Sequence, residues 1–102
     1  MKNTEYFELL DNAYNSINNE SDIYLKKIQE IILNTAQELE RKKDLNVAAV
    51  HLTQDFSGVY MSSKGLLHLN SANKKLFDVS NKIAQKYLGQ SRMGITIGPL
   101  FH

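Results

Sequence analysis

Apolar residues recur three and four positions apart through most of the chain, which places them on one stripe of an α-helix. The longest such segment runs from Ser21 to Lys43 without a glycine or proline. Ser21 is a suitable N-cap, because a hydroxyl accepts hydrogen bonds from the free N–H groups of a first helical turn. A helix of this length with one apolar stripe needs partners along its whole length, so the pattern predicts a helix bundle.

Three further segments have the same periodicity, over about residues 4–18, 47–63 and 70–88. Their predicted N-caps are Thr4, Asn46 and either Asn70 or Ser71. The connections between these segments are short, so consecutive helices should be antiparallel. The sequence therefore predicts an all-α fold, an antiparallel up-down-up-down four-helix bundle in one domain that spans residues 1–102.

Two glycines in these segments have predicted roles. Gly58, inside the third segment, costs helix propensity, and we expect it to allow the close approach of a neighbouring helix. Gly89 is expected to end the fourth helix. Residues at inward spacing are expected to form the core, namely Ile28, Ile32, Leu52, Phe56 and Ile83.

The last stretch, from about residue 90 to 102, loses the helical pattern. Met93, Ile95 and Ile97 alternate at period two, and Gly94, Gly98 and Pro99 disfavour a helix. This pattern predicts an extended C-terminal tail. Two interpretations stay open for its five apolar side chains. They either fold back along the bundle and complete the core, or form a specificity element that binds a partner.

The composition is that of an ordinary globular protein, with 42% hydrophobic and 23% charged residues. The chain has no cysteine, which excludes disulfides, thiol catalysis and thiolate metal sites. Its first residues lack the apolar core of a signal peptide, and no apolar run reaches the roughly 18 residues of a membrane span. A cytoplasmic location is expected.

The net charge of +1 conceals an asymmetry. Residues 1–40 carry eight acids against three bases, whereas residues 41–102 carry nine bases against three acids. The two halves could neutralise each other within the fold, or the basic half could face an anionic membrane or protein. Nucleic acid is not an expected partner, because lysines dominate and no exposed aromatic residues stand between them.

No pattern of catalytic or metal-binding chemistry is present. His51 and Asp55 lie one helical turn apart, but a surface ion pair explains that spacing better than a metal site that lacks a third ligand. The tyrosines of the helices lie at inward spacing and are expected in the core, with their hydroxyl groups hydrated. The sequence predicts neither an enzyme nor a bound cofactor.

The whole layout resembles the immunity proteins of class IIa (pediocin-like) bacteriocins, in particular the enterocin A immunity type. The resemblance rests on a short first helix, then a long helix with Ile-Gln-Glu-Ile-Ile-Leu at 28–33 and a charged exit at 38–45. It continues through the polar cap at Asn70-Ser71 and Lys75-Leu76-Phe77 in the fourth helix, which precedes Gly89.

This resemblance implies a bundle at the inner membrane face that recognises the bacteriocin-bound mannose phosphotransferase permease and blocks the pore. It also implies that the C-terminal half and tail select the bacteriocin. Together with the charge pattern, it identifies the expected partner-binding residues as Lys74, Lys75, Lys82, Lys86, Arg92, Met93, Ile95, Ile97, Leu100 and Phe101. The alternative function is a small helical adaptor or regulatory module that binds other proteins.

Overall fold

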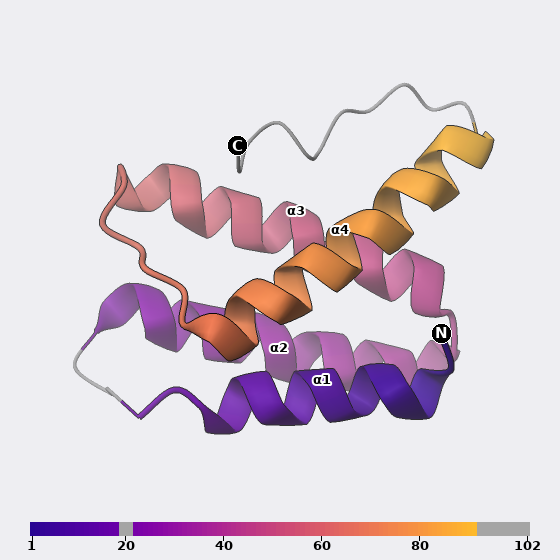
Figure 1. Cartoon of the computed structure of the whole chain (residues 1–102), viewed down its shortest axis with the longest axis horizontal. Coiled ribbons are helices and arrows are strands. Elements are labelled where there is room, and N and C mark those ends of the chain that lie inside the picture. The colour runs from indigo at the N-terminus through magenta and orange to yellow at the C-terminus, as the bar shows by residue number, and fades with distance from the viewer. Residues whose placement is uncertain (19–21, 92–102) are drawn as a thin grey trace.

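The computed structural model describes residues 1–18 and 22–91, which form a bundle of four α-helices (Figure 1). The helices are α1 (Asn3–Asn15), α2 (Ile23–Lys42), α3 (Leu45–Ser63) and α4 (Ser71–Ser91). Helix α1 contacts α2 and α4, and α3 contacts α2 and α4, which closes the ring of a bundle. The predicted all-α four-helix fold is confirmed. Among these residues, no helix combines the length and the hydropathy needed to cross a bilayer.

Carboxylates, rather than the predicted hydroxyl and amide side chains, cap α2 and α3. Asp22 accepts hydrogen bonds from the backbone N–H groups of Tyr24 and Leu25, at 2.9 and 3.1 Å. Asp44 accepts one from the N–H of Val47 at 3.2 Å. A carboxylate also gains from the positive pole of the helix dipole, which explains why α3 begins at Leu45, before the predicted cap.

The predictions for the other two helix starts had opposite outcomes. The predicted cap Thr4 is wrong, because α1 begins one residue earlier and the backbone N–H of Lys2 donates to Glu5 Oε1 at 3.0 Å. The predicted cap Asn70 is confirmed, since its Oδ1 accepts from the N–H of Asn73 at 2.9 Å.

The predicted roles of both helical glycines are wrong. A Cβ built at Gly58 meets no atom within 4 Å, so no neighbouring helix approaches it closely. Helix α4 continues through Gly89 to Ser91, because glycine permits a helix end without imposing one. The turn after α3 does use a glycine, since Gly65 has a φ of +88°.

The core contains four of the five predicted residues fully buried, whereas Ile83 is partly buried. Within it, the rings of Phe56 and Phe77 stack with centroids 6.2 Å apart and an interplanar angle of 11°. Helix α4 runs diagonally across the bundle in Figure 1, from beside α1 towards α3. A second, smaller apolar cluster accordingly joins the late residues Ala84 and Leu88 to Val50 of α3.

Buried hydrogen bonds join α4 to α1. The hydroxyl groups of Tyr6 and Ser80 share a hydrogen bond of 2.5 Å, and both side chains are fully buried. Directly after α1, Ser16 Oγ accepts from Asn73 Nδ2 at 3.1 Å and from Asn70 Nδ2 at 2.9 Å. Asn73 Oδ1 is the one buried side-chain atom of the described residues without a hydrogen-bond partner.

Tyr6→Phe should change how stability depends on alkaline pH. Burial raises the pKa of Tyr6 from 10.0 to about 12, and its hydrogen bond to Ser80 lowers it by less. Between these values the unfolded chain releases a proton that the folded chain keeps, so stability should fall by about 1.4 kcal/mol per pH unit as pH rises.

Urea unfolding at pH 7 to 11 measures this dependence. Tyr6→Phe should cost about 1 kcal/mol at pH 7, through the lost hydrogen bond, and remove this part of the alkaline decline. The matched control is Tyr14→Phe, on the exposed side of α1, which should retain the decline. Parallel curves for Tyr6→Phe and the unchanged protein would refute the interpretation.

Gly58→Ala should stabilise the protein by about 1 kcal/mol, because alanine favours the helix and the added methyl group enters open space. Thermal unfolding measures the gain. Gly65→Ala is the matched control and should destabilise, since its φ of +88° strains a residue with a side chain. A loss of stability in Gly58→Ala would contradict the described surroundings of this position.

Candidate partner-binding surface

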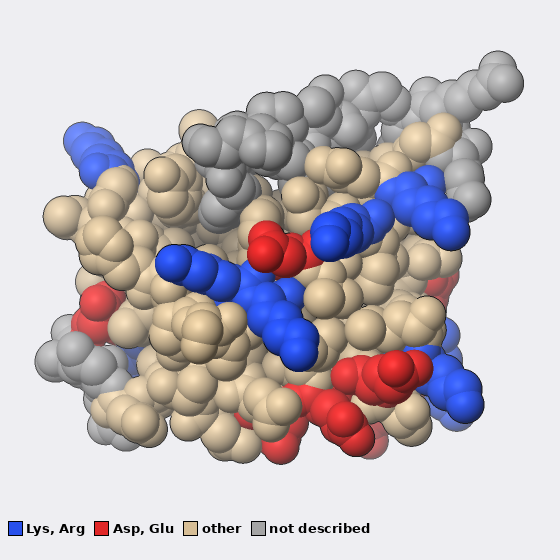
Figure 2. All heavy atoms as spheres, in the orientation of Figure 1, with Lys and Arg blue, Asp and Glu red and all other residues tan. Residues whose placement is uncertain are grey.

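The four predicted lysines of α4 are all exposed and form one row, which we call the α4 lysine row: Lys74, Lys75, Lys82 and Lys86. Figure 2 shows basic side chains along α4 on the face turned to the viewer. In the sequence of α4, the one acidic residue is Asp78. None of the four forms an ion pair within residues 1–18 and 22–91. The row thus carries positive charge that the described fold leaves without a direct partner.

The opposite side of α4 sets this orientation. Leu76, Phe77 and Ser80 are buried, and Phe77 stacks on Phe56 while Ser80 bonds to Tyr6. These contacts fix the rotation of α4 about its axis. The lysines, which lie between the buried positions in sequence, must then face solvent.

The acidic side chains of α1 lie below this row in Figure 2. Glu5, Glu8 and Asp11 are exposed, and in the described part of the chain no lysine or arginine lies within 4.0 Å of a carboxylate. Among these residues, direct lysine or arginine ion pairs therefore do not neutralise the two halves. The two rows instead give this face a basic and an acidic band.

The remaining predicted partner-binding residues belong to the tail. Arg92, Met93, Ile95, Ile97, Leu100 and Phe101 lie outside the residues that the structure describes. Their role stays a prediction, as does the extended form of the tail.

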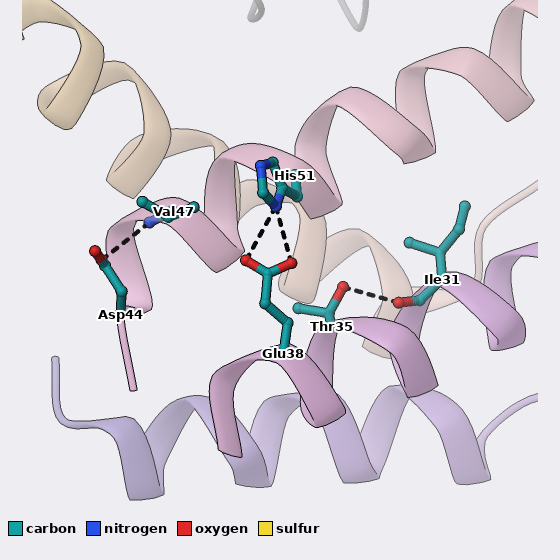
Figure 3. Close-up of polar contacts among 6 residues, drawn as sticks. All are labelled: Ile31, Thr35, Glu38, Asp44, Val47 and His51. Carbon is teal, nitrogen blue, oxygen red and sulfur yellow. Dashed lines mark hydrogen bonds and ion pairs between the residues drawn. The ribbon is translucent and has the colours of Figure 1, made fainter. Parts of the chain in front are cut away.

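His51 pairs with an acid that the sequence analysis did not consider (Figure 3). Its Nδ1 lies 2.8 and 3.0 Å from the two carboxylate oxygens of Glu38, which α2 contributes. The expected pairing with Asp55 is absent among the described ion pairs. The short connection at 43–44 could have signalled this contact, because an antiparallel hairpin of helices brings residues about equally far from the turn together.

The charges of His51 and Glu38 also affect the pKa of Asp55. Burial raises the pKa of the Asp55 carboxyl, the charge of His51 lowers it, and the negative charge of Glu38 raises it. In the described part of the chain, no group of three histidine, aspartate or glutamate side chains is arranged to hold a metal ion.

Three tyrosines differ from the sequence prediction. Tyr6 is buried, but its hydroxyl bonds to Ser80 instead of water. Tyr14 and Tyr60 are exposed and line surface grooves of about 550 and 370 Å³ respectively. The first groove lies between α1 and α2, and the second adjoins the start of α4.

The comparison with protein families relates this bundle to known proteins. The Bacteriocin immunity protein family has a model that matches residues 1–85, which is most of the chain. The chain belongs to this family. This family is not a family of enzymes. No curated protein and no solved structure gives a significant match to this family member.

Asp55→Asn should raise the melting temperature slightly at pH 7. The folded-state pKa of Asp55 is raised, so the ionised carboxylate opposes folding at neutral pH, and stability from this group is lost as pH rises through that pKa. Thermal unfolding at pH 3 and 7 tests the sign, because the gain should disappear at pH 3, where the carboxyl is protonated in both states. Asp11→Asn makes the same charge change on α1. A variant at Asp55 that is less stable than this control at pH 7 would overturn the prediction.

Proposed function

We propose that this protein protects its cell from a pediocin-like bacteriocin as an immunity protein of the enterocin A type. In this proposal it recognises the mannose phosphotransferase permease once the bacteriocin has bound, at the cytoplasmic face of the membrane, and blocks the pore. The match to the immunity family over residues 1–85 supports protection as the function. The permease and the membrane face are our inference.

The observation that carries the proposal is the α4 lysine row, which forms no ion pair with residues 1–18 and 22–91. Exposed lysines without intramolecular partners keep their attraction for an anionic surface, and a lysine near the inner leaflet contributes about 1 kcal/mol to binding. The buried contacts of Tyr6 and Phe56 hold α4 so that the row acts as one surface. A complex of a permease in an anionic membrane offers such a partner.

The end of the family match supports a separate role for the tail. The family model matches residues 1–85, so the tail lies outside the matched region. A segment outside the shared pattern is suited to discriminate between bacteriocins, since members of the family must differ there or elsewhere to be specific. We therefore place specificity in Arg92, Met93, Ile95, Ile97, Leu100 and Phe101.

Expression in a sensitive strain tests protection directly. Cells carrying the protein are challenged with a panel of pediocin-like peptides, and the inhibitory concentration should rise for at least one of them. Deleting residues 93–102 should leave a folded bundle that protects less or against different peptides. If no peptide in the panel loses activity against the expressing cells, the proposal is wrong.

Capture from membranes tests the permease. The tagged protein is incubated with membranes from cells that have or lack the mannose permease, with and without the bacteriocin. Retention should require both the permease and the bacteriocin. Equal retention by membranes that lack the permease would remove it as the partner while leaving the immunity function standing.

The pair Lys82→Gln and Lys86→Gln should weaken protection and membrane retention while changing stability by less than about 1 kcal/mol. These two lysines repel each other at four-residue spacing, so the fold gains nothing from their charges. The effect on retention should shrink at high salt, which screens surface charge. The matched control replaces Arg41 and Lys42, at the end of α2, with glutamine. Equal losses in both pairs would mean that only total charge matters.

A further inference from the structure

The end of α3 exposes large apolar side chains at a projecting corner of the bundle. Met61 and Leu66 are 63% and 67% exposed, and the adjoining Tyr60 is exposed as well. Figure 1 shows the corner where α3 ends and the chain turns back towards α4. We call Met61, Lys64 and Leu66 the tip. Leu33, the other exposed leucine of the described residues, lies on α2 and lines the groove between α1 and α2 with Tyr14.

Hydrogen bonds hold this turn in one conformation. Lys64 is left-handed, with a φ of 52°, and its N–H donates to the carbonyl of Met61 at 3.2 Å. The N–H of Leu66 donates to the carbonyl of Ser63 at 3.1 Å, and the N–H of Leu67 donates to Ser63 Oγ, also at 3.1 Å. Ser63 Oγ itself donates to the carbonyl of Tyr60 at 2.8 Å.

The turn therefore holds Leu66 outward while its neighbour faces inward. Leu67 is buried and belongs to the main core, which accounts for a leucine at that position. Packing does not explain the leucine at position 66, because a polar residue there would leave all of these backbone hydrogen bonds in place. Its exposure is a property of a fixed turn, and the fold does not explain the choice of residue.

The stretch of sequence that contains the tip is basic. Between Asp55 and Asp78 the sequence contains three lysines and no acid. Lys64 is within the tip, and Lys74 lines the same groove as Tyr60, together with Asp78. The first turns of α2 lie beside the last turn of α3, since Lys27 and Ser62 line one groove along with Glu30. Exposed apolar side chains among lysines match the interface of an anionic bilayer.

We propose that the tip inserts Met61 and Leu66 into the interface of an anionic lipid bilayer, with the neighbouring lysines on its headgroups. A bilayer fits better than a protein groove, because the apolar side chains stand on a convex corner and Tyr60 beside them suits the headgroup level. This inference rests on the proposed function in one respect, because that function brings the protein to a membrane. It gives the bundle a defined orientation there.

A single introduced tryptophan tests the insertion, because the chain has none. Leu66→Trp is mixed with vesicles of phosphatidylcholine and phosphatidylglycerol, and its emission should shift to the blue and be quenched by brominated lipid. Leu33→Trp, on an exposed site of α2, is the matched control and should show neither change. Vesicles of phosphatidylcholine alone should give a much smaller response at residue 66.

Polar substitution measures the contribution of the leucine. Leu66→Ser should lower the partition coefficient on the mixed vesicles about tenfold without changing the melting temperature, whereas Leu33→Ser should leave partitioning unchanged. Lys64→Gln should lower it about fivefold. Both effects are measured by sedimentation of the protein with vesicles.

The proposal is overturned by an unchanged spectrum of Leu66→Trp on anionic vesicles, or by equal responses at residues 33 and 66. It is also overturned if Leu66→Ser abolishes protection of cells but binds vesicles normally, because the tip would then contact a protein. The vesicles contain neither permease nor bacteriocin. Failure of the tip therefore leaves the proposed function untouched, and loss of the proposed function leaves the vesicle result standing.

Discussion

The position of α4 depends on a few buried hydrogen bonds with fixed geometry. Apolar stripes attract helices to one another, but they tolerate sliding and rotation, because the hydrophobic effect has no direction. The hydroxyl pair of Tyr6 and Ser80 and the amide of Asn73 against Ser16 allow one arrangement only. Breaking the contact between Tyr6 and Ser80 leaves a buried hydroxyl group without this partner, which costs more than the bond contributes. The orientation of the α4 lysine row follows from this constraint.

The helices could be predicted from the sequence because their apolar residues repeat with the helical period, and that signal is local. The exposure of the α4 lysines follows from the same helical period, because they lie off the apolar stripe. Cap positions were harder, since Asp22 and Asp44 competed with adjacent polar residues, and charge decided between them. Contacts between distant residues were out of reach: nothing local links Tyr6 to Ser80, or Glu38 to His51. The alternation of apolar residues in the tail predicts an extended segment, but it does not indicate which surface that segment contacts.

The molecule combines a stable interior with surfaces that the fold does not use. The α4 lysine row, the tip and Gly58 are each exposed, and each lacks an explanation in the packing of the described residues. Stability alone would favour alanine at residue 58 and a polar side chain at residue 66. Sequences that depart from what stability favours do so most often where a protein meets other molecules.

Contact between the first and last helices gives the order of synthesis a consequence. A ribosome releases α1, α2 and α3 before α4, and this leaves the hydroxyl of Tyr6 and the amide acceptors at the end of α1 hydrated until residues 70–80 emerge. The bundle closes only with its final element. A truncated chain without α4, made from a damaged messenger RNA, therefore lacks the hydrogen bonds that complete the fold. It also lacks the basic surface that α4 carries. Incomplete chains would present an open apolar face that marks them for proteolysis, and they would not compete with finished ones.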